Sequence, residues 1–151
     1  MDFFYPFHPR TVHFPIALSL VGAFFILLGA ALATRKDDGG SERWLQFGRM
    51  SLVLGWIGVL VAVITGLVDQ SRAPDDPVVT QTINLHITVG VALLVVLGLA
   101  VYWPLKNKRV WTERRWAYLA LIAVAAGLVL VESWLGGKLV YQLGVGVGPI
   151  P

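Results

Sequence analysis

The sequence predicts an all-α polytopic membrane protein with four transmembrane helices in an up-down-up-down bundle. Hydrophobic residues make up 56% of the 151 positions and charged residues only 14%, and the mean hydropathy is +0.71. These values argue against a soluble enzyme. Four apolar runs follow one another, each close to the roughly 20 residues that cross a bilayer as a helix. The connections are short, which favours antiparallel neighbours and places the first and third helices diagonally.

Residue types at the ends of the runs set the expected helix limits. The first run, 14–34, contains no charged side chain, and Pro15 falls in the first helical turn, where its missing N–H is tolerated. We expect Pro104 to close the third helix and the pair Gly136 and Gly137 to end the fourth. A single domain, 1–151, then contains helices at about 12–34, 48–70, 83–103 and 114–135, and an outer tail at 136–151.

Basic residues are unevenly distributed between the two sides of the predicted bundle. Nine lie in or beside the first and third connections and three on the other side, so the positive-inside rule places these connections in the cytoplasm and both termini in the periplasm. The expected partner is the lipid of a bacterial inner membrane and not nucleic acid, because the basic residues form no continuous face. The nine are Arg35, Lys36, Arg43, Arg49, Lys106, Lys108, Arg109, Arg114 and Arg115; the three are Arg10, Arg72 and Lys138.

The tryptophans and the start of the chain agree with this orientation. Trp44, Trp103, Trp111 and Trp116 flank the predicted cytoplasmic edge, as an interfacial aromatic belt does. The first four residues lack the basic start of a cleavable signal peptide, and the first apolar run is too long for one. We therefore expect the first helix to be retained.

Small residues form a stripe along one face of the second helix. The stripe consists of Gly55, Gly58, Ala62, Gly66 and Asp69, and it allows another helix or a flat ligand to approach the backbone closely. Tight helix packing is the simpler interpretation. Gly58 and Gly66 are also candidates for making room for a cofactor.

Ionisable side chains gather near the outer ends of the predicted helices. His13 precedes the first helix, Asp69 ends the second, and His86 and Glu132 lie about one turn inside the third and fourth. Ionisable groups at membrane depth are costly and tend to mark function. A buried His86 is a potential metal ligand, and Glu132 must be protonated, paired or coordinated. His13 can also simply lie among the headgroups, Asp69 either caps a helix or orients a histidine, and His8 is expected at the surface.

Four segments of the chain carry a resemblance to a known family. They are residues 8–18 with His-Phe-Pro at 13–15, the Thr-Gly-Leu-Val-Asp sequence at 65–69, His86, and residues 136–147 with Gly-Gly-Lys-Leu-Val-Tyr at 136–141. Together they resemble the bacterial membrane-protein family known as domain of unknown function 2231, over nearly the whole chain. The resemblance implies the four-helix topology and the importance of His13, Asp69, His86, Gly136 and Gly137. It implies no activity, because none is established for that family.

The leading hypothesis for function is one b-type haem on the outer side. Haem requires one or two imidazoles on facing helices, an apolar slot and small residues where the ring passes. His13 and His86 are the candidate axial ligands, and Gly58 and Gly66 are candidates for the slot. Such a subunit exchanges electrons with a periplasmic carrier or with quinol, as part of a larger membrane complex.

Two alternatives use the same residues differently. His13 and His86, with Asp69 and Glu132, supply two nitrogens and two carboxylates, a set that suits a non-haem zinc, iron, manganese or copper ion. The other alternative is a cofactor-free accessory subunit whose polar cluster is joined by hydrogen bonds. No catalytic residue is predicted, and an electron-transfer or accessory subunit is favoured over a stand-alone enzyme.

Overall fold

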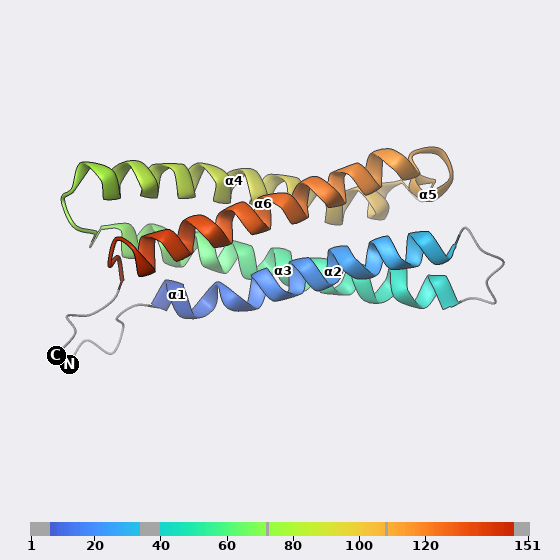
Figure 1. Cartoon of the computed structure of the whole chain (residues 1–151). Coiled ribbons are helices and arrows are strands. Elements are labelled where there is room, and N and C mark those ends of the chain that lie inside the picture. The colour runs from blue at the N-terminus through green and yellow to red at the C-terminus, as the bar shows by residue number, and fades with distance from the viewer. Residues whose placement is uncertain (1–6, 34–39, 72, 108, 147–151) are drawn as a thin grey trace.

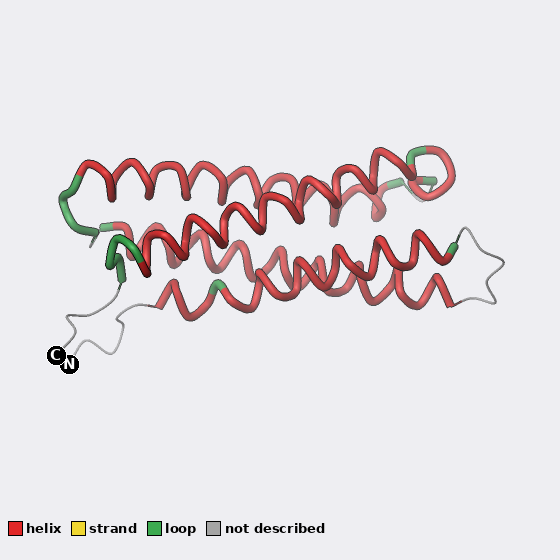
Figure 2. The backbone as a smooth tube through the Cα atoms, in the orientation of Figure 1, coloured by secondary structure: helices red, strands yellow, loops and turns green. Residues whose placement is uncertain are grey.

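The protein is a bundle of long helices. The computed structural model describes residues 7–33, 40–71, 73–107 and 109–146 (Figure 1). Helices account for all the regular secondary structure in these ranges, with no strand among them (Figure 2). The helices are α1 (Phe7–Thr11), α2 (His13–Leu32), α3 (Gly40–Gln70), α4 (Pro77–Lys106), α5 (Val110–Glu113) and α6 (Arg115–Tyr141).

Four helical segments are long and apolar enough to cross a membrane. They are His8–Leu32, Gly40–Gln70, Pro77–Lys106 and Arg115–Tyr141. The first combines most of α1 with α2, because backbone hydrogen bonds from Val12 N to His8 O and from Ile16 N to Val12 O continue across their junction. The predicted class, an all-α protein with four candidate spans, is confirmed.

Each of the four spans extends beyond its predicted limits at one end or at both. α3 begins at Gly40, and α4 begins at Pro77, where the Asp76 carboxylate accepts hydrogen bonds from the N–H groups of Val78 and Val79. Asp before Pro is a strong helix start. The predicted limits fell short because hydropathy marks the segment in hydrocarbon, whereas a capped helix continues into the polar region.

The two residues expected to end helices lie inside them. Pro104 is part of α4, and the carbonyl of Ala100, which cannot receive a hydrogen bond from a proline, accepts one from the Tyr118 hydroxyl at 3.2 Å. This hydrogen bond gives the Ala100 carbonyl a partner and so offsets part of the cost of an interior proline. Gly136 and Gly137 are continuous with α6. The following turn of α6 buries Leu139 against α4, which favours its helical conformation.

The helices pair as two antiparallel hairpins. In the first, formed by α1, α2 and α3, Gly29 faces Leu45, Gly22 faces Leu52, and a position late in α3, Gly66, faces His8. In the second, formed by α4, α5 and α6, the contacts of Gly136 with His86 and of Tyr118 with Ala100 show the same reversal. α3 packs against α4 and α2 against α6, so the two hairpins lie side by side.

A buried line of residues runs along each long helix, and we call it the seam. Its positions alternate in steps of three and four, the spacing that keeps one face of a helix against its neighbours. In α2 the seam contains Pro15, Ser19, Gly22, Ile26 and Gly29, and in α6 it contains Tyr118, Ile122, Ala125 and Val129.

Glycines bring α2 and α3 into close contact. A Cβ atom added to Gly22 would lie 2.7 Å from Leu52 Cδ2, and one added to Gly48 would lie 2.8 Å from the backbone nitrogen of Ile26. Gly55 faces Ser19 in the same way. In the small-residue stripe predicted on the second helix, Gly55 and Gly58 therefore pack against α2 and Gly66 against α1, as small residues do between membrane helices.

Aromatic side chains fill the end of the bundle near α5. Tyr118 is fully buried, and the rings of Trp103 and Trp111 meet it edge to face at centroid distances of 6.4 Å and 5.1 Å. Val110 of α5 is also fully buried. Two of the tryptophans predicted for an interfacial belt thus pack inside the bundle, whereas Trp116 is 80% exposed. We call this end, which also carries Arg109, Arg114 and Arg115, the basic end.

Candidate functional site

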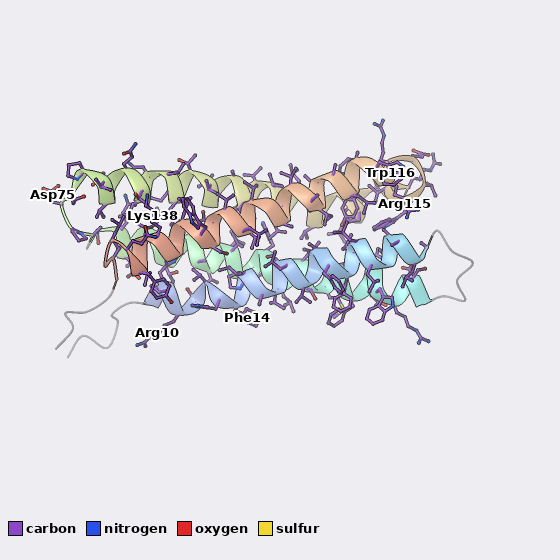
Figure 3. All side chains as sticks on the ribbon, viewed as in Figure 1. Arg10, Phe14, Asp75, Arg115, Trp116 and Lys138 are labelled. Carbon is purple, nitrogen blue, oxygen red and sulfur yellow. The ribbon has the colours of Figure 1, made fainter. Side chains whose placement is uncertain are left out.

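Two histidines and two acids from four different helices meet at the end of the bundle opposite α5. Arg10, Asp75 and Lys138 mark this end in Figure 3. The first hairpin contributes His8 and Asp69 and the second contributes His86 and Glu132, and we call these four residues the histidine cluster. His86 and Glu132 each lie nine positions from the end of their helix, at Pro77 and Tyr141. At 1.5 Å per residue this corresponds to about 14 Å along the helix axis.

His8 is fastened to α3 by hydrogen bonds. Its backbone N–H donates to Asp69 Oδ2 at 3.1 Å, and its ring Nδ1 lies 3.2 Å from Thr65 Oγ1. The ring covers Gly66, where an added Cβ would lie 3.1 Å from His8 Cε1. Asp69 therefore caps α1, and the glycine gives the imidazole its place on α3.

The partners of Thr65 define the tautomer of His8. The Thr65 hydroxyl is 3.0 Å from the carbonyl oxygens of both Val61 and Ala62. A hydroxyl has one proton. When Thr65 donates that proton to a helix carbonyl, its oxygen can only accept a hydrogen bond from the imidazole, so His8 Nδ1 carries the ring hydrogen. His8 Nε2 then carries the free lone pair, the form in which imidazole binds a metal.

His86 and Glu132 form a looser pair in the second hairpin. Their side chains are 17% and 18% exposed, and His86 Nδ1 lies 3.1 Å from Glu132 Oε1. That distance suits an ion pair, but His86 Nδ1 and Glu132 Oε2 are buried without a hydrogen-bond partner in the described part of the chain. The short contact is thus not an aligned hydrogen bond. An added Cβ on Gly90 would lie 2.9 Å from Glu132 Oε1, so the carboxylate packs against the backbone of α4 at this glycine.

The two halves of the cluster touch through their histidines. The rings of His8 and His86 are 6.1 Å apart between centroids and inclined at 81°, an edge-to-face arrangement. With both carboxylates ionised and both imidazoles neutral, the cluster has two negative charges. A charge at this depth requires compensation by protons or by a cation.

His8, not His13, is the histidine that contacts His86. His13 is exposed on α2, two positions before the seam residue Pro15. Two residues correspond to about 200° around a helix, so the ring points away from the bundle. The structure therefore does not bring His13 and His86 together, and the expectation that His8 lies at the surface is wrong, because its ring is half-buried.

A sequence signal for His8 was available in the heptad spacing. His8, Pro15, Gly22 and Gly29 follow one another at intervals of seven, which places His8 on the seam of a continuous first helix. Asp69, His86 and Glu132 also fall at seam positions of their own helices. His8 and His86 thus fall at seam positions of their helices, whereas His13 does not, and this difference could be read from the sequence.

The two glycines proposed to make room for a cofactor are covered by other parts of the chain. An added Cβ on Gly58 would lie 2.9 Å from Pro15 Cβ, and Gly66 is covered by His8. Among the described residues, no group of three or more His, Cys, Asp or Glu side chains is arranged so that it could hold a metal ion as it stands. The cluster therefore consists of two half-sites, His8 with Asp69 and His86 with Glu132.

Comparison with known proteins identifies the family but no characterised relative. Residues 5–149 match the family described as predicted membrane protein (DUF2231). No curated protein and no solved structure matches the chain. The match covers the spans and the histidine cluster alike. The chain therefore belongs to the DUF2231 family of predicted membrane proteins.

Proposed function

We propose that this membrane protein binds one metal centre at the histidine cluster, with His86, Glu132 and His8 as ligands. The observation that carries the proposal is the contact between His86 and Glu132, in which one atom of each side chain is buried without a hydrogen-bond partner. Buried polar groups in native proteins are nearly always paired. An imidazole and a carboxylate without hydrogen-bond partners among the described residues, beside a second imidazole, are a donor set that a cation would satisfy.

Charge and donor type both suit a divalent transition metal. The cluster offers two imidazoles and two carboxylates, and in the form with both carboxylates ionised its charge would match that of a doubly charged cation. Such mixed nitrogen and oxygen sets bind zinc, iron, manganese and copper. Asp69 has a positioning role in this arrangement, because its carboxylate accepts the backbone N–H of His8.

Binding requires a small rearrangement of the second half-site. Within the described residues neither His86 Nδ1 nor Glu132 Oε2 has a hydrogen bond to break, so both side chains would be able to rotate toward the lone pair on His8 Nε2. The fixed half-site, His8 held by Thr65 and Asp69, stays in place. A site that closes around its metal in this way is consistent with the absence of a formed triad in the described residues.

The geometry favours a bare ion over b-type haem. A porphyrin beside α3 would have to displace Pro15 from Gly58 and His8 from Gly66, and the exposed His13 is not available to the iron from within the bundle. Haem ligated by His86 is therefore the competing proposal, and its Soret absorption distinguishes it from a bare ion.

A redox-active ion at this place would serve electron exchange with quinol or a periplasmic carrier. This use depends on orientation, which we infer from the positive-inside rule. The basic end then faces the cytoplasm of a bacterial inner membrane, and the histidine cluster and both termini face the periplasm.

A cofactor-free accessory subunit is the second candidate. It is favoured by the bonds of His8 to Thr65 and Asp69, which join α1 to α3 without any ligand. In that case the His86 and Glu132 pair would be satisfied by a proton, and its neighbours would be other subunits of a membrane complex.

Metal analysis and absorption spectroscopy of the purified protein test the proposal. We expect stoichiometric metal without a Soret band, and loss of the metal in His86→Ala and Glu132→Gln. His13→Ala is the matched control, since this histidine is exposed near the same end, and it should retain the metal. A stable wild-type protein that neither contains nor takes up metal would contradict the proposal and favour the cofactor-free accessory subunit. A Soret band would instead establish haem.

A further inference from the structure

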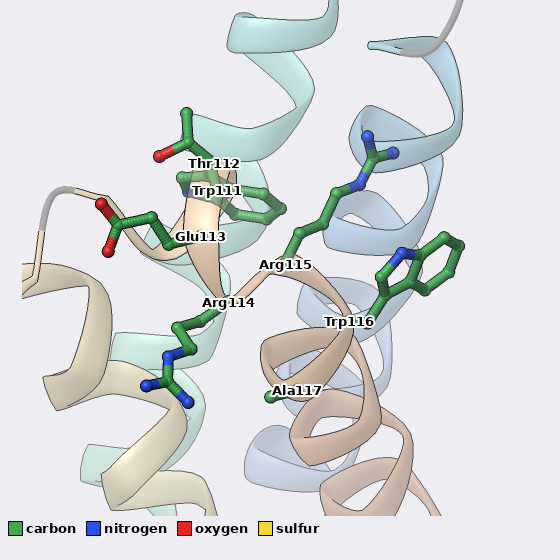
Figure 4. Close-up of a pocket in the computed structure, with 7 residues that line it drawn as sticks. All are labelled: Trp111, Thr112, Glu113, Arg114, Arg115, Trp116 and Ala117. Carbon is green, nitrogen blue, oxygen red and sulfur yellow. The ribbon is translucent and has the colours of Figure 1, made fainter.

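A pocket of about 340 Å³ lies at the basic end, where α5 meets α6. It is far from the histidine cluster along the helices, because α6 begins at this pocket and carries Glu132 in its second half. Figure 4 shows Arg114 and Arg115 extending in different directions from the start of α6. The pocket is lined by Trp111, Thr112, Glu113, Arg114, Arg115 and Trp116, together with Ala117.

The lining contains donors that lack acceptors. Trp111 Nε1 and Arg115 Nε are buried without a hydrogen-bond partner in the described ranges. Both atoms carry a hydrogen and neither accepts one in these side chains. In addition, Arg114 occupies the N-cap position of α6, and its side chain accepts no hydrogen bond from the first backbone N–H groups of that helix. A ligand with several acceptor oxygens would satisfy these groups together.

The charge of the lining is positive. Glu113 is its one acid, and the Glu113 carboxylate is 3.3 Å from Arg109 Nη1, which offsets its charge. The Arg115 guanidinium donates to the carbonyl of Ala30 on α2, which holds it at the junction of the two hairpins. Arg114 makes no side-chain hydrogen bond or ion pair within the residues that the structure describes. The preferred ligand is therefore an anion.

We propose that this pocket binds the phosphate headgroup of an anionic phospholipid. The pocket lies where an apolar span begins, so it is at the level of the headgroups. Beside it, Trp116 is 80% exposed, and two turns further along α6 Val124 is 54% exposed. These apolar side chains provide a surface for the acyl chains. Basic pockets at the ends of transmembrane helices bind anionic headgroups by the same combination of charge and apolar contact.

Native mass spectrometry of the full-length protein with added phosphatidylglycerol or phosphatidylcholine tests this site. We expect selective retention of phosphatidylglycerol. Arg114→Gln should weaken it about fivefold, which corresponds to about 1 kcal/mol for one basic residue near an anionic surface. Arg114 is the residue of choice, because its side chain has no structural bond to lose. Lys106 is an exposed basic residue at the same end but outside the pocket, so the control variant Lys106→Gln should retain phosphatidylglycerol as the wild type does.

Trp111→Phe provides an independent second variant. It keeps an aromatic ring against Tyr118 but removes the unpartnered N–H, so it should also weaken phosphatidylglycerol retention while the thermal midpoint of the lipid-free protein changes little. Equal retention of the two lipids, or equal losses in Arg114→Gln and Lys106→Gln, would overturn the proposal. Inorganic phosphate that protects the protein against heat where phosphatidylglycerol does not would assign the pocket to free phosphate instead.

Discussion

The two hairpins hold their histidines in opposite ways. In the first, His8 is bonded through its backbone to Asp69 and through its ring to Thr65, on helices that glycines bring into close contact. In the second, His86 has one short, unaligned contact with Glu132, on helices whose buried positions include larger side chains such as Leu97 and Ile122. The comparison shows that the first hairpin fixes its histidine within the protein, whereas the second leaves its histidine loosely held, and under the proposed function the second is the part that a metal ion would complete.

The largest effect should follow from disturbing the glycine contact of the first hairpin. In Gly48→Ala the new methyl group would meet the backbone of Ile26 at 2.8 Å, so α2 must shift, at a cost of about 3 kcal/mol by the upper range for overpacking. We expect a thermal midpoint in detergent several degrees lower. Gly127→Ala is the control, because an added Cβ there meets nothing within 4 Å. Similar midpoints for both variants would show that the hairpins do not differ in packing.

Removal of the cap on α1 should have the next largest effect. Asp69→Ala leaves the backbone N–H of His8 without its carboxylate partner, and a hydrogen bond to a charged group contributes about 1.5–3 kcal/mol. We expect lower thermal stability and faster hydrogen exchange at the amides of α1. Asp69→Asn keeps an acceptor and should lose less. Unchanged exchange in Asp69→Ala would mean that α1 is held by other contacts.

The Tyr118 hydroxyl, which donates to the Ala100 carbonyl in place of the N–H that Pro104 lacks, should contribute about 1 kcal/mol to the free energy of unfolding. Tyr118→Phe removes the bond to the Ala100 carbonyl while keeping the aromatic packing. Pro104→Ala restores a backbone N–H that can donate to the same carbonyl. The Tyr118→Phe substitution should therefore cost less stability in the Pro104→Ala background than alone. Equal costs in the two backgrounds would show that the hydroxyl and the proline are not coupled.

The smallest effect on stability is expected at Glu132. Because Glu132 Oε2 has no partner among the described residues and its other oxygen is not aligned with His86, Glu132→Gln removes a charge that no hydrogen bond offsets and should not lower the stability of the metal-free protein. The same substitution should strongly weaken metal binding. A large loss of stability without metal would instead identify the pair as a structural ion pair, as buried pairs lose several kcal/mol when one partner is removed.

The sequence predicted the class of fold well because hydropathy reports directly on the segments in hydrocarbon. It did not predict the full helices, since the Asp76 cap and the Tyr118 hydroxyl act through contacts that hydropathy does not measure. Thus α4 passes Pro104, and α6 passes Gly136 and Gly137.

The site was predicted in part. Asp69, His86 and Glu132 were assigned to one end of the bundle from their positions in the apolar runs, and they lie there. The choice of His13 as the partner of His86 failed because it relied on depth alone, whereas the direction of a side chain depends on its phase along the helix. The short contact between His86 and Glu132 depends on the register of α4 against α6, which no single helix encodes.

The most direct test of a single metal site spanning both hairpins is a double-mutant cycle in zinc affinity. Isothermal titration of the metal-free protein would compare the wild type, His8→Ala, His86→Ala and the double variant, with His13→Ala as the control. A shared site predicts that each single substitution weakens zinc binding and that the double variant loses less than the sum of the two. Zinc binding that His8→Ala leaves intact, or that His13→Ala abolishes, would contradict the site.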